Sequence, residues 1–407
     1  MQTLRNGYTT GACAAAGVWA ALRFLHGEDY TQAQFAALDG TPLTIPVRAV
    51  RETADGICAE VIKDAGDDPD ITDGVSVFTT VRLTGAAGVR YHAGTGIGTV
   101  TKAGLAVPVG EPAINPGPRA LIAQVVQAEL RGLAAGVDVT IAIPAGVALA
   151  QQTLNPVLGI VGGISVIGTT GVVRPMSEEG FKNSLVPQID VALAAGEETL
   201  IFVPGKIGER IARRWGLPAQ ALVQTSNFIG FLLQAAAERG ARHVLLFGHP
   251  GKLVKVAAGV FHTHNRVADA RLETLAAYGA ANGLTQKQVQ AVLAANTTED
   301  ALKILQAAGL QEQVCRVIAA RASARAERYV FGKMQVGTVL VALQGQLLGM
   351  DEHAAAWLRE WGVTADDAAA FMAGHCIPGN GAASDTAAGH ATATDIAAEQ
   401  GAREHGA

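Results

Sequence analysis

The clearest structural signal in this chain is the segment RHVLLFGHPGKLVK at residues 242–255. Its first part, residues 242–247, is a short apolar run that ends at a glycine, which is typical of a buried parallel strand. The glycine-rich turn after it would let backbone N–H groups approach a ligand, and the next helix would offer the positive end of its dipole. Lys252 and Lys255 lie three positions apart, so we expect them to share one face of that helix.

Charged side chains gather in and after this turn, although only 16% of the chain is charged. This concentration predicts the wall of a binding site for an anionic ligand, because charge-assisted hydrogen bonds from basic groups recognise carboxylates and phosphates. The candidate substrate-binding residues of this wall are His249, Lys252, Lys255, Arg266 and Arg271. The alternative is an ordinary strand–turn–helix connection with solvated lysines, since short glycine motifs occur by chance.

Around this segment, strand and helix patterns alternate across residues 197–350. This alternation predicts a parallel, Rossmann-like sheet, in which ligands bind outside the carboxyl ends of the strands. Two of those ends carry glycine-rich turns, so we expect a nucleotide-like cofactor to lie across them. The candidate cofactor-binding residues are Gly205, Gly208, Gly248 and Gly251. The expected strands are residues 199–203, 221–224, 242–247 and 336–343, and the expected helices lie at 206–215, 228–239, 272–281, 286–294, 298–308 and 311–329.

The first half has a different pattern, which predicts a mixed α+β domain. An alanine-rich helix follows Thr9, whose hydroxyl can cap it. A turn at residues 168–171 follows an expected strand at 164–167 and supplies hydroxyls and then a cation, so Thr169, Thr170 and Arg174 are further candidate ligand contacts. The other expected elements are a helix at residues 119–131 and strands at 43–47, 57–62, 75–83 and 137–143.

The expected fold class is therefore α/β with α+β, an N-terminal mixed α+β domain followed by a Rossmann-like parallel-sheet domain. We expect the boundary near Gly196, which separates residues 1–196 from residues 197–350. A C-terminal helical segment is expected at residues 351–377. Residues 378–407 are rich in Gly, Ala, Ser and Thr without a periodic apolar pattern, so we expect a disordered tail.

Composition excludes several classes of protein. The net charge is −5, and no basic tail or stripe occurs, which argues against nucleic acid as a partner. No apolar run approaches the ~18 residues of a membrane span. The four cysteines show no CxxC spacing, so we expect reduced thiols and a cytoplasmic protein. Cys13 is expected to be a small buried residue rather than a nucleophile. The sequence leaves a homo-oligomer open.

Several separated motifs together carry a family resemblance. They are GYTTGACAA at residues 7–15, GIGTVTKAGL at 96–105, EPAINP at 111–116, GTTG at 168–171 with PMS at 175–177, and the run from Gly251-Lys252 through Thr263-His264 to Asp269-Ala270-Arg271. In this order they resemble the CbiD-type cobalt-precorrin-5B (C-1)-methyltransferases of anaerobic cobalamin biosynthesis. The resemblance extends from about residue 4 to about residue 350.

This resemblance implies methylation of C-1 of cobalt-precorrin-5B by S-adenosylmethionine, which gives cobalt-precorrin-6A. The cobalt would be carried by the corrinoid substrate, and no resident metal is expected. Because the transfer is an in-line displacement, positioning should supply most of the catalysis. We take His262, His264 and Asp269 as catalytic candidates and add Thr9 and Thr10 to the substrate-binding candidates.

Three other functions compete for the same residues. A metal-dependent hydrolase is suggested by the HxH element at His262 and His264, whose side chains share a face only if the segment is extended. A nicotinamide-dependent oxidoreductase is suggested by the Rossmann-like half alone, but the GxGxxG pattern is missing. A non-enzymatic tetrapyrrole carrier would bind the corrinoid without turnover.

Overall fold

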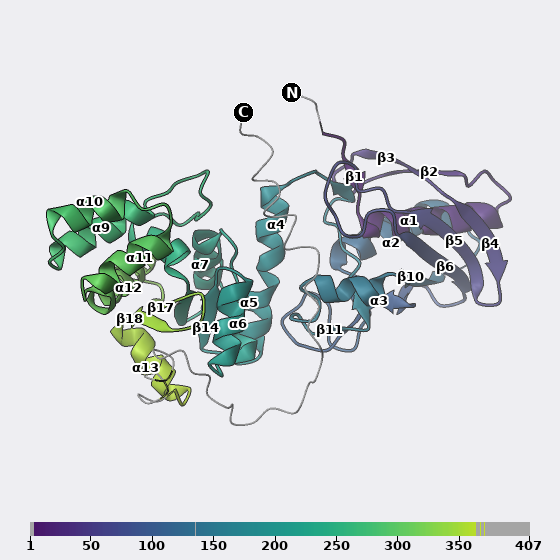
Figure 1. The fold of residues 1–407 in the computed structure, drawn as a ribbon. Coiled ribbons are helices and arrows are strands. Elements are labelled where there is room, and N and C mark those ends of the chain that lie inside the picture. The colour runs from purple at the N-terminus through teal and green to yellow at the C-terminus, as the bar shows by residue number, and fades with distance from the viewer. Residues whose placement is uncertain (1–3, 135, 364–366, 368–369, 371–407) are drawn as a thin grey trace.

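The computed structural model describes residues 4–134, 136–363, 367 and 370. Two bodies lie side by side, and each is built around one five-stranded sheet (Figure 1). The expected tail at 378–407 falls outside the described residues, and so does the part of the expected helical segment at 351–377 that follows residue 363, apart from residues 367 and 370.

The first sheet is mixed, with the strand order β4-β5-β6-β10-β7. Neighbouring strands are antiparallel except β10 and β7, which run parallel. The strands predicted near residues 57–62, 75–83 and 137–143 are confirmed, while β4 and β7 at the two edges were not predicted. The strands are β4 (Ala49–Thr53), β5 (Gly56–Ile62), β6 (Ser76–Thr84), β7 (Gly88–Ala93) and β10 (Gly136–Ala142).

Two helices cover one face of this sheet, namely α1 (Thr10–Leu25) and α2 (Pro116–Glu129). The predicted cap is confirmed, since the Thr9 hydroxyl accepts a hydrogen bond of 3.1 Å from the backbone N–H of Ala12. Helix α1 is buried on almost every side because its alanines and glycines allow close packing. A Cβ atom on Gly17, for example, would lie 2.7 Å from the side chain of Thr79 in β6.

Short strand pairs connect the two bodies and complete the first one. The strand predicted at residues 164–167 is wrong in extent, because only Gly163–Ile164 pairs in a ladder and Val166 makes an isolated bridge. The chain there bends around the first turns of α1 and α2 instead of extending. The pairs are β1 (Gly7–Tyr8) with β13 (Val172–Val173), β2 (Gln32–Ala36) with β3 (Pro42–Pro46), β8 (Gly96–Ile97) with β12 (Gly163–Ile164), and β9 (Thr99–Val100) with β11 (Ile160–Val161), beside the short α3 (Gly146–Leu149).

The second sheet has the order β15-β14-β16-β17-β18. Its first four strands run parallel, and β18 is antiparallel to β17. The strands predicted near residues 199–203, 221–224, 242–247 and 336–343 are found. They are β14 (Thr199–Val203), β15 (Leu222–Gln224), β16 (His243–Gly248) and β17 (Gln335–Val341), joined by β18 (Leu347–Met350).

Helices lie on both faces of this sheet because successive apolar side chains of each strand point to opposite faces. Leu200 and Phe202 of β14 belong to the cluster on the face with α7, α8 and α12, whereas Ile201 and Val203 belong to the cluster with α6 and α13. The helices are α6 (Lys206–Arg214), α7 (Ile229–Glu238), α8 (Pro250–Ala257), α12 (Gln311–Tyr329) and α13 (Glu352–Glu360).

Three further helices pack outside α8 and α12 and complete the predicted set. They are α9 (Arg271–Ala281), α10 (Gln286–Leu293) and α11 (Thr298–Ala307). Each lies within one residue of its predicted bounds because turn and capping residues mark the ends clearly, as with the capping box at Thr285 and Gln288. No helix in the described part of the chain is long and apolar enough to cross a membrane.

The expected domain boundary near Gly196 falls after two helices, α4 (Glu178–Leu185) and α5 (Pro187–Ala194). Leu185 and Ile189 of these helices are buried in the core of the second sheet. Gly104 of the first body lies close to α5, since a Cβ atom there would be 2.4 Å from the carbonyl oxygen of Asp190. The two helices therefore pack with the second body and contact the first.

A buried carboxylate in the first sheet gives a prediction about acid stability. Asp138 of β10 accepts hydrogen bonds of 2.7 Å from Arg82 Nη2 and from Arg90 Nε, on the two neighbouring strands. These bonds, with that of Arg82 first, lower the pKa of Asp138 to about 2. The unfolded chain should bind this proton near pH 4, so the stabilisation is present above that pH and is lost as the pH falls toward 2.

Replacing Asp138 by asparagine is therefore expected to lower the free energy of unfolding at pH 7 by about 0.5 to 1 kcal/mol, because both arginines are largely exposed. The difference from the unsubstituted protein should vanish as the pH approaches 2. Urea titrations at several pH values measure both effects. Asp55→Asn, in an exposed turn, is the control. A difference that does not change with pH would contradict the role of the charge.

Candidate active site

The two predicted glycine-rich turns lie next to each other at the carboxyl ends of β14 and β16, which are paired parallel strands. Gly205 has φ 162° and ψ 169°, an extended conformation, and a Cβ atom there would meet no heavy atom within 4 Å. By contrast, a Cβ atom on Gly248 would lie 3.0 Å from Pro204 Cδ. At this edge of the sheet, open space therefore lies next to the Cα atom of Gly205 and not next to that of Gly248.

Helix α6 begins at Gly205 without a side-chain cap. The first backbone N–H groups of an uncapped helix need partners and favour negative charge nearby. Gly208, in the first turn of the same helix, is buried. A Cβ atom on Gly208 would lie 3.4 Å from the carbonyl oxygen of Phe247. This helix end can therefore hold an anionic or polar group of a ligand against the backbone.

Two threonine hydroxyls near this edge are buried and have no hydrogen-bond partner in the described part of the chain. Thr225 follows β15 directly, and Thr298 begins α11. Thr298 Oγ1 lies 3.8 Å from the Cβ position of Gly251, in the first turn of α8. Unpaired buried hydroxyls are uncommon, because each carries an uncompensated desolvation cost.

His249 caps helix α8 and is not a free ligand group. Its Nδ1 accepts a hydrogen bond of 3.0 Å from the N–H of Gly251, so the ring carries its proton on Nε2. Nε2 lies 2.5 Å from Glu299 Oε1 in α11. Both ring nitrogens are thus used within the chain, and substrate binding by His249 stays a prediction.

Lys252 ties together the loops after β14 and β15. Its Nζ donates hydrogen bonds to the carbonyl oxygen of Pro204 at 2.7 Å and to that of Ser226 at 3.4 Å. Burial, and then the charge of Lys255, lower the pKa of Lys252 to about 8. The three donors of an ammonium group leave one for a ligand.

Lys255 does not belong to a solvent-facing wall. The side chain is fully buried, and Nζ donates to the carbonyl oxygens of Thr263 and Ala268 at 3.0 Å and to Asn265 Oδ1 at 2.5 Å. All of its donors are used to fold the loop over residues 259–269. At this position the helix face points into the protein, so the buried contacts of Lys255 favour a structural role, and substrate binding by Lys255 stays a prediction.

The remaining charged candidates lie in this loop and at the start of α9. Arg271 forms a double hydrogen bond with Asp269, from Nε to Oδ1 at 2.8 Å and from Nη2 to Oδ2 at 2.6 Å. Each charge of this partly exposed pair is thus met by the other, and the expected roles of Arg271 in substrate binding and of Asp269 in catalysis stay predictions. Arg266 is exposed, and its guanidinium makes no hydrogen bond or ion pair with the described residues.

His262 stacks on Phe228 with ring centroids 5.0 Å apart and an interplanar angle of 20°. The His262 and His264 rings are 6.5 Å apart and tilted by 46°. Across the described residues, no three His, Cys, Asp or Glu side chains gather as a metal site would require. Within this HxH element, His262 is therefore arranged as one ring of a stack with Phe228.

The hydroxyl residues of the first body have structural partners. Thr9 caps α1, and Thr10 Oγ1 bonds with the N–H of Ile167 at 3.0 Å and with its carbonyl oxygen at 3.3 Å. Both are buried, which favours a structural role, and their contact with substrate stays a prediction. Thr170 accepts a bond from the backbone of Val172 at 3.3 Å, while Thr169 and Arg174 are exposed.

Cys13 is fully buried in α1, as expected from the sequence. Burial raises the pKa of its thiol to about 12. The thiolate needed for nucleophilic attack is therefore not populated near neutral pH.

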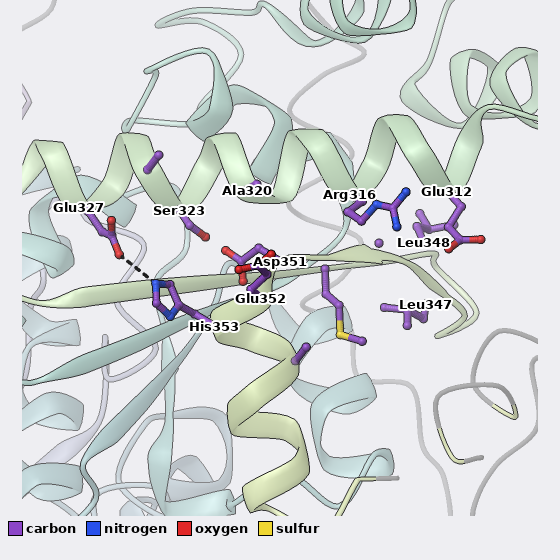
Figure 2. A pocket seen from close by; sticks show the side chains of 14 residues that line it. Glu312, Arg316, Ala320, Ser323, Glu327, Leu347, Leu348, Asp351, Glu352 and His353 are labelled. Carbon is purple, nitrogen blue, oxygen red and sulfur yellow. Dashed lines mark ion pairs between the residues drawn. The ribbon is translucent and has the colours of Figure 1, made fainter. Parts of the chain in front are cut away.

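A cavity of about 670 Å³ lies away from these residues, between α12 and the strand β18. Figure 2 shows Arg316 and Glu312 near Leu348 on one side, and His353 opposite Glu327 on the other, with Nε2 and Oε1 4.0 Å apart. Asp351 caps α13 through a bond of 2.9 Å from the N–H of Ala354, and burial raises its pKa. No residue predicted from the sequence lines this cavity.

Sequence reasoning missed several side chains at the carboxyl edge. Glu299 and the buried threonines Thr225 and Thr298 come from segments that gave no motif. Phe228 was predicted only as part of the helix at residues 228–239, and Phe181 was not singled out. A signal was available for Phe228, because it lies in the short loop that follows a parallel strand, at the edge where ligands bind.

Comparison with known proteins places these features in a family. Residues 1–175 match the family described as CbiD, and residues 262–352 match the CbiD C-terminal domain. A cobalt-precorrin-5B C(1)-methyltransferase of Moorella thermoacetica is 51% identical over 89% of this chain and 99% of its own. The enzymes of the same name from Desulfitobacterium hafniense and Methanocaldococcus jannaschii are each 44% identical, over 86% and 84% of this chain and 90% and 95% of their own.

One solved structure is also similar. It is the crystal structure of a cobalamin biosynthesis protein (cbiD) from Archaeoglobus fulgidus, with 25% sequence identity and a TM-score of 0.36, which covers 66% of this chain and 84% of its own.

Proposed function

Because this chain belongs to the CbiD family, we propose that it transfers a methyl group to C-1 of cobalt-precorrin-5B, the reaction for which its relatives are named. The observation that carries this proposal is the identity of 51% across nearly the whole length of both chains. The product would be cobalt-precorrin-6A. The cobalt belongs to the substrate.

We take S-adenosylmethionine as the methyl donor and place it at the carboxyl edge of the second sheet. Three observations support this position: the open space in front of Gly205, the uncapped start of α6, and the unpartnered hydroxyls of Thr225 and Thr298. Bound there, the donor would supply an electrophilic methyl group to C-1. The backbone at Gly205, Gly208, Gly248 and Gly251 would hold it through close approach.

This placement follows the general rule for open parallel sheets, in which ligands bind beyond the carboxyl ends of the strands. It goes together with a Rossmann-like assignment for the second domain, which we propose for residues 197–350. Since α4 and α5 pack into the core of the same sheet, we propose to extend this domain to include them. The first domain would then hold the preceding residues.

The substrate side of the site would use the basic groups that the fold leaves available. Arg266 is exposed, Lys252 keeps one donor, and Arg174 and Thr169 are exposed on the first body. Such groups would bind the peripheral carboxylates of the corrinoid by charge-assisted hydrogen bonds. His262 is the titratable side chain that we propose to lie next to the macrocycle, with His264 beyond it.

The proposal is tested by incubating the purified protein with cobalt-precorrin-5B and S-adenosylmethionine that carries a labelled methyl group. We expect one label in each corrinoid product molecule, bonded to C-1. Omission of the protein is the control. Tight corrinoid binding without any labelled product would instead support a carrier.

A chelator is expected to leave methyl transfer unchanged, because His262 stacks on Phe228 and the described residues gather no metal-binding group. The measurement is the initial rate before and after treatment with EDTA, with elemental analysis of the purified protein. Loss of activity that returns on adding zinc, with one zinc bound per chain, would contradict this expectation and favour the hydrolase alternative.

A further inference from the structure

Four rings from three separate segments form a continuous series beside the candidate donor site. Phe181 of α4 meets Phe228 edge-to-face with ring centroids 5.8 Å apart, and Phe228 stacks on His262 at 5.0 Å. His264 follows at 6.5 Å. We call these residues the ring series; Phe181, at one end, is 52% exposed.

The ring series lies at the carboxyl edge of the second sheet. Phe228 comes four residues after β15, and the N–H of Thr263 donates a bond of 2.9 Å to the carbonyl oxygen of Asn227, which ties the two loops together. Lys252 binds the carbonyl oxygen of Ser226 in the same loop. The series and the space in front of Gly205 therefore adjoin neighbouring strand ends, β15 and β14.

What distinguishes Phe181 from other exposed apolar side chains, such as Phe331, is its contact with further rings: its exposed part continues a packed aromatic surface. The Phe181 ring packs edge-to-face on Phe228, which stacks in turn on His262, so its orientation is restrained before binding and less conformational entropy remains to be lost. Only 5% of the residues are Phe, Trp or Tyr. With so few aromatic residues in the chain, a ring series of this length beside a glycine-rich edge is unusual.

We propose that the ring series is the surface on which the flat corrinoid macrocycle rests, with Phe181 as its outer contact. This inference rests on the proposed function and adds to it the residues that orient the ring. A large conjugated macrocycle packs favourably on aromatic faces and edges.

The charges around the series fit the same occupant. Arg266, two residues after His264, donates its backbone N–H to His264 Nδ1 at 3.1 Å, and its exposed guanidinium, which pairs with none of the described residues, would meet a peripheral carboxylate. At the other end, Lys182 lies beside Phe181 in the chain, paired with Glu179 at 2.7 Å and over the ring of Phe231 at 5.0 Å. The free cation is therefore at the Arg266 end, and an apolar platform with a cation at one end complements an apolar macrocycle with an anionic rim.

The test compares Phe181→Ala, Phe181→Trp and Phe181→Leu with the unsubstituted protein. Corrinoid affinity is measured from the absorption change of cobalt-precorrin-5B, and donor affinity by calorimetry with S-adenosylhomocysteine. We expect Phe181→Ala to weaken corrinoid binding about five- to tenfold and to raise KM more than it lowers kcat, with unchanged donor affinity. Phe181→Trp should bind almost normally, and Phe181→Leu should lie between.

Phe331→Ala is the matched control, since Phe331 is 86% exposed and lies after α12, outside the ring series. Unchanged corrinoid affinity in Phe181→Ala, beside an active unsubstituted protein, would overturn this inference and leave the proposed function standing. Failure of Phe181→Trp to restore what Phe181→Ala loses would also overturn it, because any aromatic face should serve. If the unsubstituted protein does not bind the corrinoid, that result contradicts both this inference and the proposed function.

Discussion

Replacing Gly205 by valine is expected to weaken the binding of S-adenosylhomocysteine by at least about 100-fold, or about 2.7 kcal/mol, while the protein stays folded. The backbone of Gly205 is extended, so a valine can adopt it without strain, and its Cβ would meet no heavy atom within 4 Å. The branched methyl groups would instead fill the space at the start of α6. If the donor lies there, they would prevent its close approach to the backbone.

Calorimetric titration of the variant with S-adenosylhomocysteine measures this effect, and thermal unfolding reports whether the fold is intact. Gly85→Val is the matched control, because a Cβ atom there also meets nothing within 4 Å and the residue lies in the first body. Gly205→Ala should give an intermediate loss. Normal donor affinity in a folded Gly205→Val protein would rule out this position for the donor.

Gly248 is a poorer probe of the same site, although the two glycines look equivalent in the sequence. A Cβ atom on Gly248 would press against Pro204 Cδ at 3.0 Å, so a valine there would disturb the chain with or without a ligand. The difference arises from the packing of two neighbouring turns, which no local pattern reveals.

The elements of the second sheet were predictable because strong local signals agree with the tertiary structure. Each buried strand is a short run of β-branched and apolar residues, and glycine or capping residues mark the helix ends. The edge strands β4 and β7 of the first sheet were not predicted. Their side chains are largely exposed, so they lack the apolar alternation on which such predictions depend.

The position of the glycine-rich turns at adjacent strand ends could be predicted from the sequence, but the contacts of the charged side chains around them could not. Spacing shows that Lys252 and Lys255 share a helix face, yet it does not show that this face is turned inward. Likewise, Asp269 and Arg271 are close enough in sequence to neutralise each other, which depends on the backbone conformation between them. Three-dimensional contacts decide which charges remain free for a ligand.

The buried position of Lys255 predicts a large effect on stability. Replacing it by alanine is expected to lower the free energy of unfolding by about 2 to 4 kcal/mol, because two carbonyl oxygens and the Asn265 side chain lose their donor and a buried cavity remains. The loop over residues 259–269, which carries His262, should then lose its fixed position. Urea unfolding measures the stability, and limited proteolysis measures the opening of the loop.

Lys303→Ala is the matched control for this variant, since Lys303 is 71% exposed in its side chain and makes only a surface pair with Asp300. It should change stability by less than about 0.5 kcal/mol. The two roles of Lys255 predict opposite results. A structural lysine gives lower stability in the absence of any ligand, and corrinoid affinity then falls only as far as the loop is displaced. A substrate-binding lysine would give a protein of normal stability with weaker corrinoid binding, and that result would contradict the buried contacts described here.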